Sequence, residues 1–175
     1  MSYNVKKGKQ GANGRGDKFR TFEDLEVYQV AREFRKKMYA VTRQLPEFEK
    51  FELASQIRRA AISLTNNMAE GHGRYHFADQ VRFSLASRGS LQELVDDLNV
   101  CEDEKYLHND KVAELKEEAW RVLGLINGYL RYLRDRKADE RSIVREGDDT
   151  ITVDDDDTLA LLDEALSDTR AVLTI

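Results

Sequence analysis

Apolar side chains recur every three to four residues in four long segments of the chain, which is the period of an amphipathic helix. The segments run from about 22 to 44, 48 to 69, 77 to 102 and 110 to 137. The second segment has an apolar seam with a 3-4-3-4 spacing at Ala54, Ile57, Ala61, Leu64 and Met68. No strand-like alternation competes in these segments. Four helices of this length with short connections predict an all-α, up-down antiparallel four-helix bundle.

Capping and helix-breaking residues mark the ends of these helices. Thr21 is placed to cap the first helix, and Pro46 forces a break after it. Gly71 fits the left-handed position just past the end of the second helix. Gly89 lies in the middle of the third helix, where glycine costs roughly 1 kcal/mol relative to alanine. Gly124 and Gly128 form a small-xxx-small pair in the fourth helix. We therefore expect another helix to approach closely at these glycines.

A row of polar side chains lies beside the apolar seam of the second helix, with steps of 3-4-4-3: Gln56, Arg59, Ser63, Asn67 and Glu70. These side chains share one face next to the core. Arg59 and Glu70 are roughly 16 Å apart along the axis, so they cannot pair with each other. Each needs a partner on another helix or another chain, because a half-buried charge left alone is costly. A buried network between helices or subunits, a solvated polar face and an active site are all open interpretations. We favour the network, since a straight bundle face offers no obvious pocket.

Charge is unevenly distributed along the 175 residues, although the net charge is only −5. Residues 1–20 hold six basic side chains and one acid, whereas residues 138–175 hold twelve acids and three arginines. The segment 21–137 between them is nearly neutral. We predict a flexible basic arm at 1–20, a bundle at 21–137 and an acidic tail at 138–175. The tail includes a short amphipathic helix with apolar positions at Leu159, Leu162, Leu166 and Leu173.

Basic side chains gather in the arm, on the outer face of the first helix and near the end of the fourth, where they also suit the helix dipole. Together they could form a surface that tracks phosphates. The alternative is an ordinary solvated surface. The acidic run at 154–157 resembles phosphate in charge density and could occupy the same cations. The candidate nucleic-acid-binding residues are Lys6, Lys7, Lys9, Arg15, Lys18, Arg20, Arg32, Arg35, Lys36, Arg43, Arg131 and Arg134.

Signals for catalysis, cofactors and membranes are weak. The sequence "GHGR" at 71–74 lacks the lysine and Ser/Thr of a phosphate-binding loop. A metal site could be drawn from His72, His76, Glu70 and Asp79, but these residues do not have a fixed helical spacing. The single cysteine, Cys101, excludes an internal disulfide and a cysteine zinc site. No apolar run approaches the roughly 18 residues of a membrane helix, and no signal peptide is evident. We predict no catalytic residue, metal, cofactor or membrane contact, and a cytoplasmic location.

Several blocks, in this order along the chain, resemble one known family. They are "FEDLEVYQVAREF" at 22–34, "QIRRAAIS" at 56–63, "NMAEGHGR" at 67–74 and "RFSLASRGSLQEL" at 82–94. Over about 22–135 the chain is similar to the four-helix bundle family of 23S ribosomal-RNA intervening-sequence proteins. That family includes the accessory variability determinant (Avd) of diversity-generating retroelements. The arm and the tail lie outside the family pattern, and the near-neutral body differs from the strongly basic retroelement members.

The resemblance implies an assembly and a class of partner. Family members form ring-like homo-oligomers, typically pentamers, and have no known enzymatic activity. The retroelement members bind nucleic acid and a reverse transcriptase through basic surfaces. The resemblance also implies that the row from Gln56 to Glu70 is the shared polar network at helix contacts.

We therefore expect a non-enzymatic, homo-oligomeric accessory protein that binds RNA or DNA, or a ribonucleoprotein or reverse-transcriptase partner. The alternative from another class is a protein-interaction scaffold without nucleic-acid contact. A lesser alternative is a metal or small-molecule enzyme that uses His72, His76 and Glu70. Deleting residues 1–20 should weaken nucleic-acid binding, and deleting residues 148–175 should strengthen it.

Overall fold

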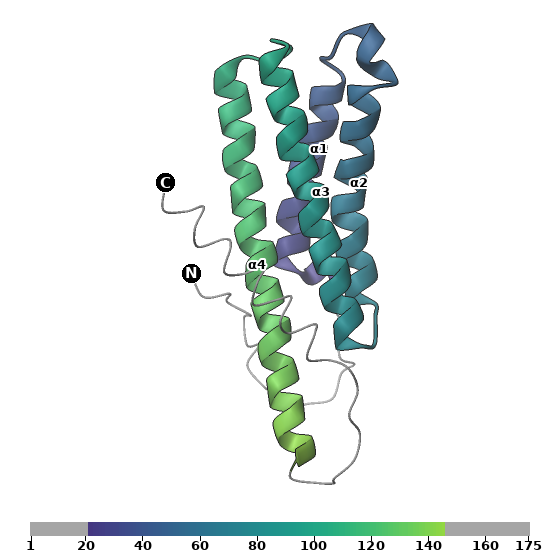
Figure 1. Ribbon diagram of the computed structural model, residues 1–175, viewed down its shortest axis with the longest axis vertical. Coiled ribbons are helices and arrows are strands. Elements are labelled where there is room, and N and C mark those ends of the chain that lie inside the picture. Colours follow the sequence, from purple (N-terminus) through teal and green to yellow (C-terminus); the bar gives the residue numbers. More distant parts are fainter. Residues whose placement is uncertain (1–20, 146–175) are drawn as a thin grey trace, which may run out of the picture.

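The computed structural model of the chain describes residues 21–145, with side chains described as far as Lys137. The predicted arm at 1–20 and the predicted tail helix around Leu162 lie outside the described residues. Figure 1 shows four long helices that run alternately up and down side by side. This arrangement confirms the all-α four-helix bundle. The elements are η1 (Phe22–Asp24), α1 (Glu26–Thr42), η2 (Glu47–Lys50), α2 (Leu53–His72), α3 (Phe77–Asp103) and α4 (Asn109–Arg145).

The apolar seam predicted for the second helix forms the centre of the core. All five of its residues, from Ala54 to Met68, are buried. Val27 and Ala31 of α1 are buried as well, which the spacing of larger side chains in that helix did not reveal. Leu25 and Tyr28, near the start of the first predicted helix, are only half-buried. The contact between α2 and α3 is the most extensive in the bundle, and that between α1 and α4 is the least extensive of the four neighbouring pairs.

Thr21 caps a short turn and not the long first helix. Its Oγ1 accepts a hydrogen bond from the Glu23 backbone N–H at 3.2 Å, and the Asp24 carboxylate accepts one from the Thr21 backbone N–H at 3.1 Å. This capping box closes within η1. Leu25 is then extended, with φ −73° and ψ 124°, so α1 begins only at Glu26. The predicted start of the first helix at about 22 was therefore wrong, because a separate turn, η1, occupies Phe22–Asp24.

The prediction for Gly71 was also wrong. Gly71 is a buried residue inside α2, and the helix ends at Gly73 with φ −79°, so neither glycine adopts the left-handed conformation. A Cβ at Gly71 would lie 2.9 Å from the Cβ of Phe83. The glycine is needed because α3 comes so close to α2 at this point.

Gly89 and Gly124 behave in the opposite way. Both are exposed, and no atom of the described chain lies within 4 Å of where a Cβ would be at either glycine. The expected close approach of another helix of the same chain is absent at these two positions, because both glycines face outward from the bundle. Gly128, the other member of the predicted pair in α4, is buried.

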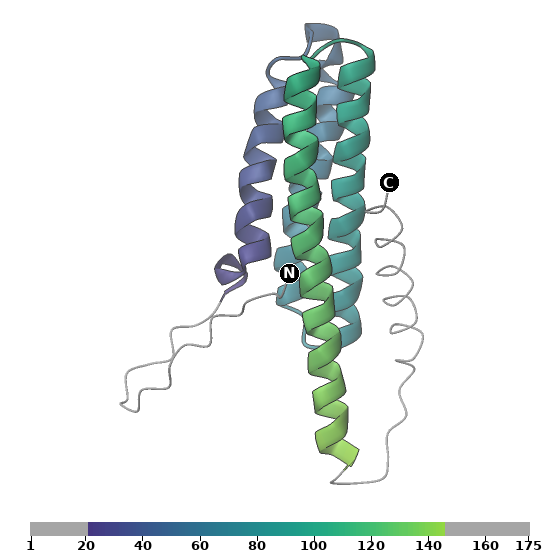
Figure 2. The ribbon, with the colours of Figure 1, turned by 90° about the vertical axis from the view of Figure 1, so that its left-hand side faces the viewer.

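Helix α4 is longer than its sequence pattern predicted. We expected it to end near Lys137, but it continues to Arg145. The physical reason is the absence of glycine and proline from Tyr129 to Glu146. Figure 2 shows α4 projecting beyond the other three helices. Arg131 and Arg134 therefore lie well inside the helix, and the argument from the helix dipole does not apply to them.

Candidate nucleic-acid interface

Four of the predicted cations lie on one outer face of α1, at Arg32, Arg35, Lys36 and Arg43. Arg32, Lys36 and Arg43 are exposed, and Lys36 Nζ donates to Glu33 Oε1 at 2.6 Å. Arg35 is half-buried, and its Nη1 donates a hydrogen bond of 2.7 Å to Thr65 Oγ1 on α2. Arg35 therefore also joins α1 to α2, while the other three cations project from the surface.

Arg58 extends this surface onto α2, and the sequence analysis did not include it. Arg58 precedes Thr65 by seven residues, so both lie on the side of α2 that faces α1. Its Nη2 donates to the Lys50 backbone carbonyl at 2.8 Å. A seven-residue step from Thr65 could have indicated the position, but only the Arg35 contact shows which side of α2 faces α1. We call Arg32, Arg35, Lys36, Arg43 and Arg58 the α1/α2 basic face.

An apolar side chain, Ile62, lies within the α1/α2 basic face. It is 41% exposed and is one helical turn from both Arg58 and Thr65. Tyr39 is half-buried on the same outer stripe of α1, between Lys36 and Arg43. The face thus combines cations, which can contact phosphates, with one apolar and one aromatic side chain, which can contact bases or the side chains of a partner.

The cations of α4 form a second, weaker group. Arg131 is exposed, whereas Arg134 is half-buried with its Nε 3.5 Å from Asp135 Oδ1. Lys137 is buried with its ammonium 4.8 Å from the centre of the Phe77 ring. Lys137 therefore makes a cation–π contact that joins α4 to the start of α3. The six arm candidates, from Lys6 to Arg20, lie outside the described residues.

The polar row of α2 lies along the contact with α3. Gln56 Nε2 donates to Asp97 Oδ1 at 2.8 Å, and Ser90 Oγ donates to Ser63 Oγ at 2.8 Å. Asn67 Nδ2 donates to the Ser63 carbonyl and hydroxyl oxygens at 2.9 and 3.0 Å. Gln56 and Ser63 are thus hydrogen-bonded to α3, while Asn67 is bonded to Ser63 within α2.

The two charged members of the row are arranged differently. Arg59 is exposed, and its Nη1 donates to Ser55 Oγ one turn earlier at 3.3 Å. Glu70 is exposed and forms an ion pair with Arg74. Both find partners within α2 and the residues that follow it, so neither needs a second helix or a second chain.

Asp97 is the buried acid of this contact. It is 1% exposed, and its Oδ2 has no hydrogen-bond partner within the part of the chain that the structure describes. Burial raises the pKa of the Asp97 carboxyl to about 6, while the hydrogen bond from Gln56 acts in the opposite direction. Nothing in the spacing of residues along the third helix pairs Asp97 with Gln56, so this contact became evident only from the structure.

The histidines and nearby acids of the described residues do not form a metal centre. The described residues contain no group of three His, Cys, Asp or Glu side chains that could hold a metal ion. His72 is half-buried and His76 is exposed beside the Tyr75 ring, while Glu70 is engaged by Arg74. None of the helices between residues 21 and 145 combines the length and apolar character that a bilayer span requires.

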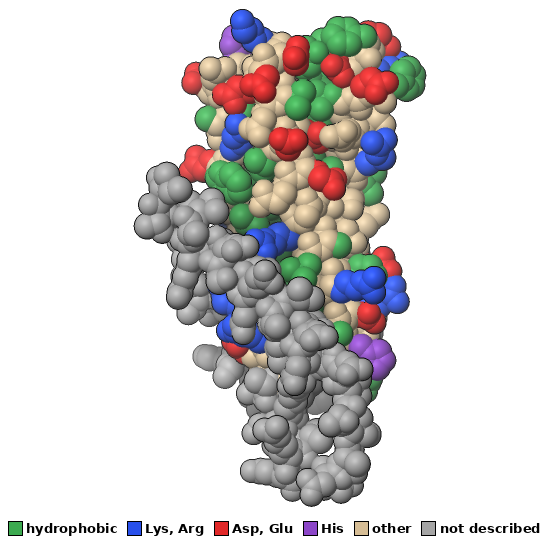
Figure 3. Space-filling view, in the orientation of Figure 1, with side chains coloured by type: hydrophobic (Ala, Val, Ile, Leu, Met, Phe, Trp, Pro, Cys, Tyr) green, Lys and Arg blue, Asp and Glu red, His purple; other side chains and the backbone are tan. Residues whose placement is uncertain are grey.

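Acidic side chains dominate the end of the bundle where η2 and the α3–α4 connection lie (Figure 3). Glu47, Glu49 and Glu52 surround two exposed phenylalanines there, Phe48 and Phe51. This end is unsuited to phosphate contact, so the cations that could bind a nucleic acid are those on the helix flanks.

The comparisons with known proteins place the chain in one family. The model of the 23S rRNA-intervening sequence protein family matches residues 23–128, which include α1, α2, α3 and more than half of α4. Among curated proteins, no match to the chain reaches significance. The matched region contains both the α1/α2 basic face and the polar row of α2. The chain therefore belongs to the 23S rRNA-intervening sequence protein family.

Proposed function

We propose that this protein is a non-enzymatic accessory protein of the cytoplasm that binds structured RNA, or a ribonucleoprotein, through the α1/α2 basic face. The observation that carries the proposal is the row of exposed cations at Arg32, Lys36 and Arg43, with Arg35 and Arg58 beside it. Such a row can follow a phosphate backbone without an enclosed pocket. The family, which is named for an insertion in a ribosomal RNA, supports RNA over other polyanions.

Assembly into a homo-oligomer is part of this proposal, and a ring of five copies is the form that the family resemblance implies. One copy presents only a few cations on each surface, and several of them already have a partner. Joining copies makes each further contact intramolecular, which raises the apparent affinity without any new kind of contact.

A charge-reversal variant tests the RNA surface. Arg32→Glu, Lys36→Glu and Arg43→Glu together should lower the affinity for a structured RNA hairpin about tenfold or more at low salt, because three phosphate contacts are lost. Arg35 is left unchanged, since it also joins α1 to α2. Retention of the labelled hairpin on a filter, measured across a salt series, gives the affinity.

The matched control reverses three cations at the acidic end, with Lys50→Glu, Lys105→Glu and Lys111→Glu. It changes the net charge by the same amount and should lower the affinity by about threefold at most. Equal losses in both triple variants would mean that only net charge matters, and the α1/α2 basic face would then have no special role. A duplex DNA of equal length shows whether the surface distinguishes RNA from DNA.

A protein-interaction scaffold is the second candidate, and one observation favours it. Phe48 and Phe51 are 70% and 79% exposed at the acidic end of the bundle. Exposed aromatic side chains of this size commonly mark protein contacts. A basic protein partner, with a reverse transcriptase as the example that the resemblance suggests, would fit this end. Absence of RNA retention at low salt in the unmodified protein would favour this function.

A further inference from the structure

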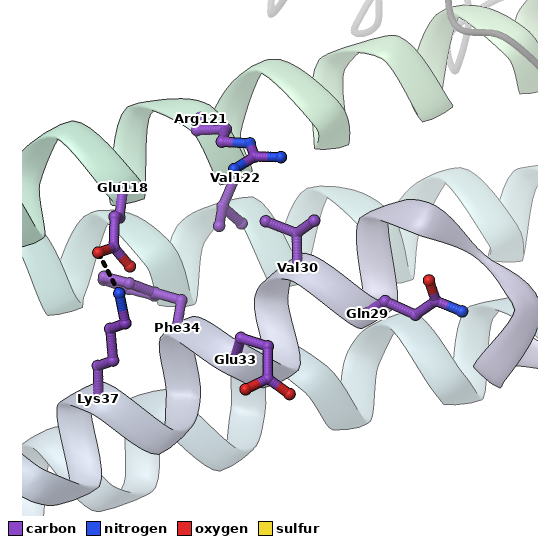
Figure 4. Close-up of a pocket in the computed structure, with 8 residues that line it drawn as sticks. All are labelled: Gln29, Val30, Glu33, Phe34, Lys37, Glu118, Arg121 and Val122. Carbon is purple, nitrogen blue, oxygen red and sulfur yellow. Dashed lines mark hydrogen bonds and ion pairs between the residues drawn. The ribbon is translucent and has the colours of Figure 1, made fainter.

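An open groove of about 370 Å³ lies between α1 and α4, on the side of the bundle where neighbouring helices make the least extensive contact. Its floor is apolar and consists of Val30, Phe34 and Val122. Figure 4 shows Val30 and Val122 pointing toward each other across the groove. A groove with such a floor has room for a row of apolar side chains from another helix.

The charged side chains at the edge of the groove differ in whether they already have an ion-pair partner. Lys37 and Glu118 face each other and form an ion pair (Figure 4). Glu33 is engaged by Lys36. Arg121 is exposed at the same edge, and it has no hydrogen bond or ion pair with any described residue. The groove thus offers a cation to an acidic occupant.

We propose that the acidic segment 158–173 of the same chain binds in this groove as an amphipathic helix. Its apolar positions, Leu159, Leu162 and Leu166, follow the 3-4 spacing that a groove between two helices accepts. Asp163 lies one turn from both Leu159 and Leu166, at the border of this apolar side, where its carboxylate can reach the unoccupied Arg121 at the edge of the groove. Both the spacing and the charge therefore match the α1/α4 groove.

The length of the chain allows this placement. Helix α4 ends at Arg145, 23 residues beyond Val122, which corresponds to about 35 Å along its axis. The 12 residues from 146 to 157 can span about 40 Å when extended. The segment that begins at Thr158 can therefore return along α4 to the level of the groove. Its route lies beside the helix from which it departs, so no other helix has to be crossed.

Proximity crosslinking in the full-length chain tests the proposal. One variant carries Glu33→Cys at the groove together with Ser167→Cys in the tail, one turn after Asp163, so that Asp163 itself is kept. The matched control carries Glu93→Cys, at a similar height on α3, with the same tail cysteine; both glutamates are exposed. Cys101 does not interfere, because it is buried and burial raises the pKa of its thiol to about 11.

A short bis-maleimide at about 1 µM protein should crosslink the groove pair at least about fivefold faster than the control pair. Leu162→Asp with Leu166→Asp should abolish this preference. Arg121→Glu should reduce it, and Arg82→Glu, a reversal of an exposed arginine on α3, should not. Equal rates for both cysteine pairs, or products of twice the chain mass, would overturn the proposal; the second result would mean that the tail binds a neighbouring copy.

This measurement needs no nucleic acid, so its failure and a failure of RNA binding can be told apart. A bound tail would also bring acidic side chains close to Arg32 and Lys36 on α1. The Leu162→Asp, Leu166→Asp variant should therefore bind the RNA hairpin about threefold or more tightly than the unmodified protein. Unchanged RNA affinity together with an intact crosslinking preference would place the tail in the groove without a regulatory effect, and would overturn this last step alone.

Discussion

At Gly71, α2 and α3 approach each other too closely to leave room for a side chain. A Cβ there would lie 2.9 Å from the Cβ of Phe83, an atom fixed to the backbone of α3. Alanine is the better helix former by roughly 1 kcal/mol, but the two helices would have to separate to admit it. We expect Gly71→Ala to lower the free energy of unfolding by about 1–3 kcal/mol in urea titrations followed by circular dichroism.

Gly124→Ala is the control for this prediction. No described atom lies within 4 Å of a Cβ at Gly124, so the same substitution should raise the free energy of unfolding by up to about 1 kcal/mol. Opposite signs for the two glycines would identify close packing as the cause. Stabilisation at both positions would contradict the close contact at Gly71.

Asp97 makes the stability of the bundle depend on pH. Its pKa is raised to about 6 in the folded protein, mainly by burial, against about 3.9 in an unfolded chain. The folded state therefore binds this proton more tightly. The contribution of Asp97 to the free energy of unfolding falls as the pH rises from about 4 to 6, and it stays low above that range.

Asp97→Asn removes this charge but keeps an oxygen that can accept from Gln56. We expect the variant to be more stable than the unmodified protein by about 1–2 kcal/mol at pH 7.5, with the difference shrinking toward pH 4. Urea titrations at several pH values measure it. Asp96→Asn, at an exposed neighbour, should leave the pH dependence nearly unchanged. If Asp97→Asn instead lowers the free energy of unfolding at pH 7.5, the charged carboxylate of Asp97 stabilises the folded protein and the prediction is wrong.

At the scale of the helices, the sequence predicted what depends on the period of apolar residues. The five-residue seam of α2 is buried throughout, because a regular 3-4 spacing leaves only one face for the core. Boundaries were less predictable. Thr21 and Asp24 form a capping box within a single turn. The chain therefore forms the separate turn η1 first, and α1 starts only at Glu26.

The candidate site was predictable only in part, for a related reason. The stripe of cations on α1 follows from spacing within one helix. Arg58 and Asp97 were missed because their roles depend on which side of one helix faces another, and spacing within a single helix does not contain that information. The glycines show the same limit, because the sequence predicted a close approach at Gly89 and a helix end at Gly71, yet of these two only Gly71 meets a neighbouring helix.

At the scale of the whole molecule, the bundle is nearly neutral, but its positive and negative side chains lie on different parts of its surface. Cations line the outer side of α1 and part of α2. Acids cluster at the end that carries η2 and the α3–α4 connection, which is the end seen at the top of Figure 3. Such a separation allows a polyanion to bind one flank of a protein whose net charge is negative. It also limits how many phosphates a single copy can neutralise.

This limit makes the proposed assembly testable by its salt dependence. Without residues 1–20, one copy offers seven candidate cations, and the logarithm of the binding constant should then fall with that of the salt concentration with a slope no steeper than about −6. The seven are Arg32, Arg35, Lys36, Arg43, Arg58, Arg131 and Arg134. An assembly that engages the basic faces of several copies should exceed that slope. Light scattering on the same protein should give a mass that is a multiple of one chain. A monomer with a slope shallower than −6 would mean that a single copy accounts for all binding, and the argument from avidity would fail.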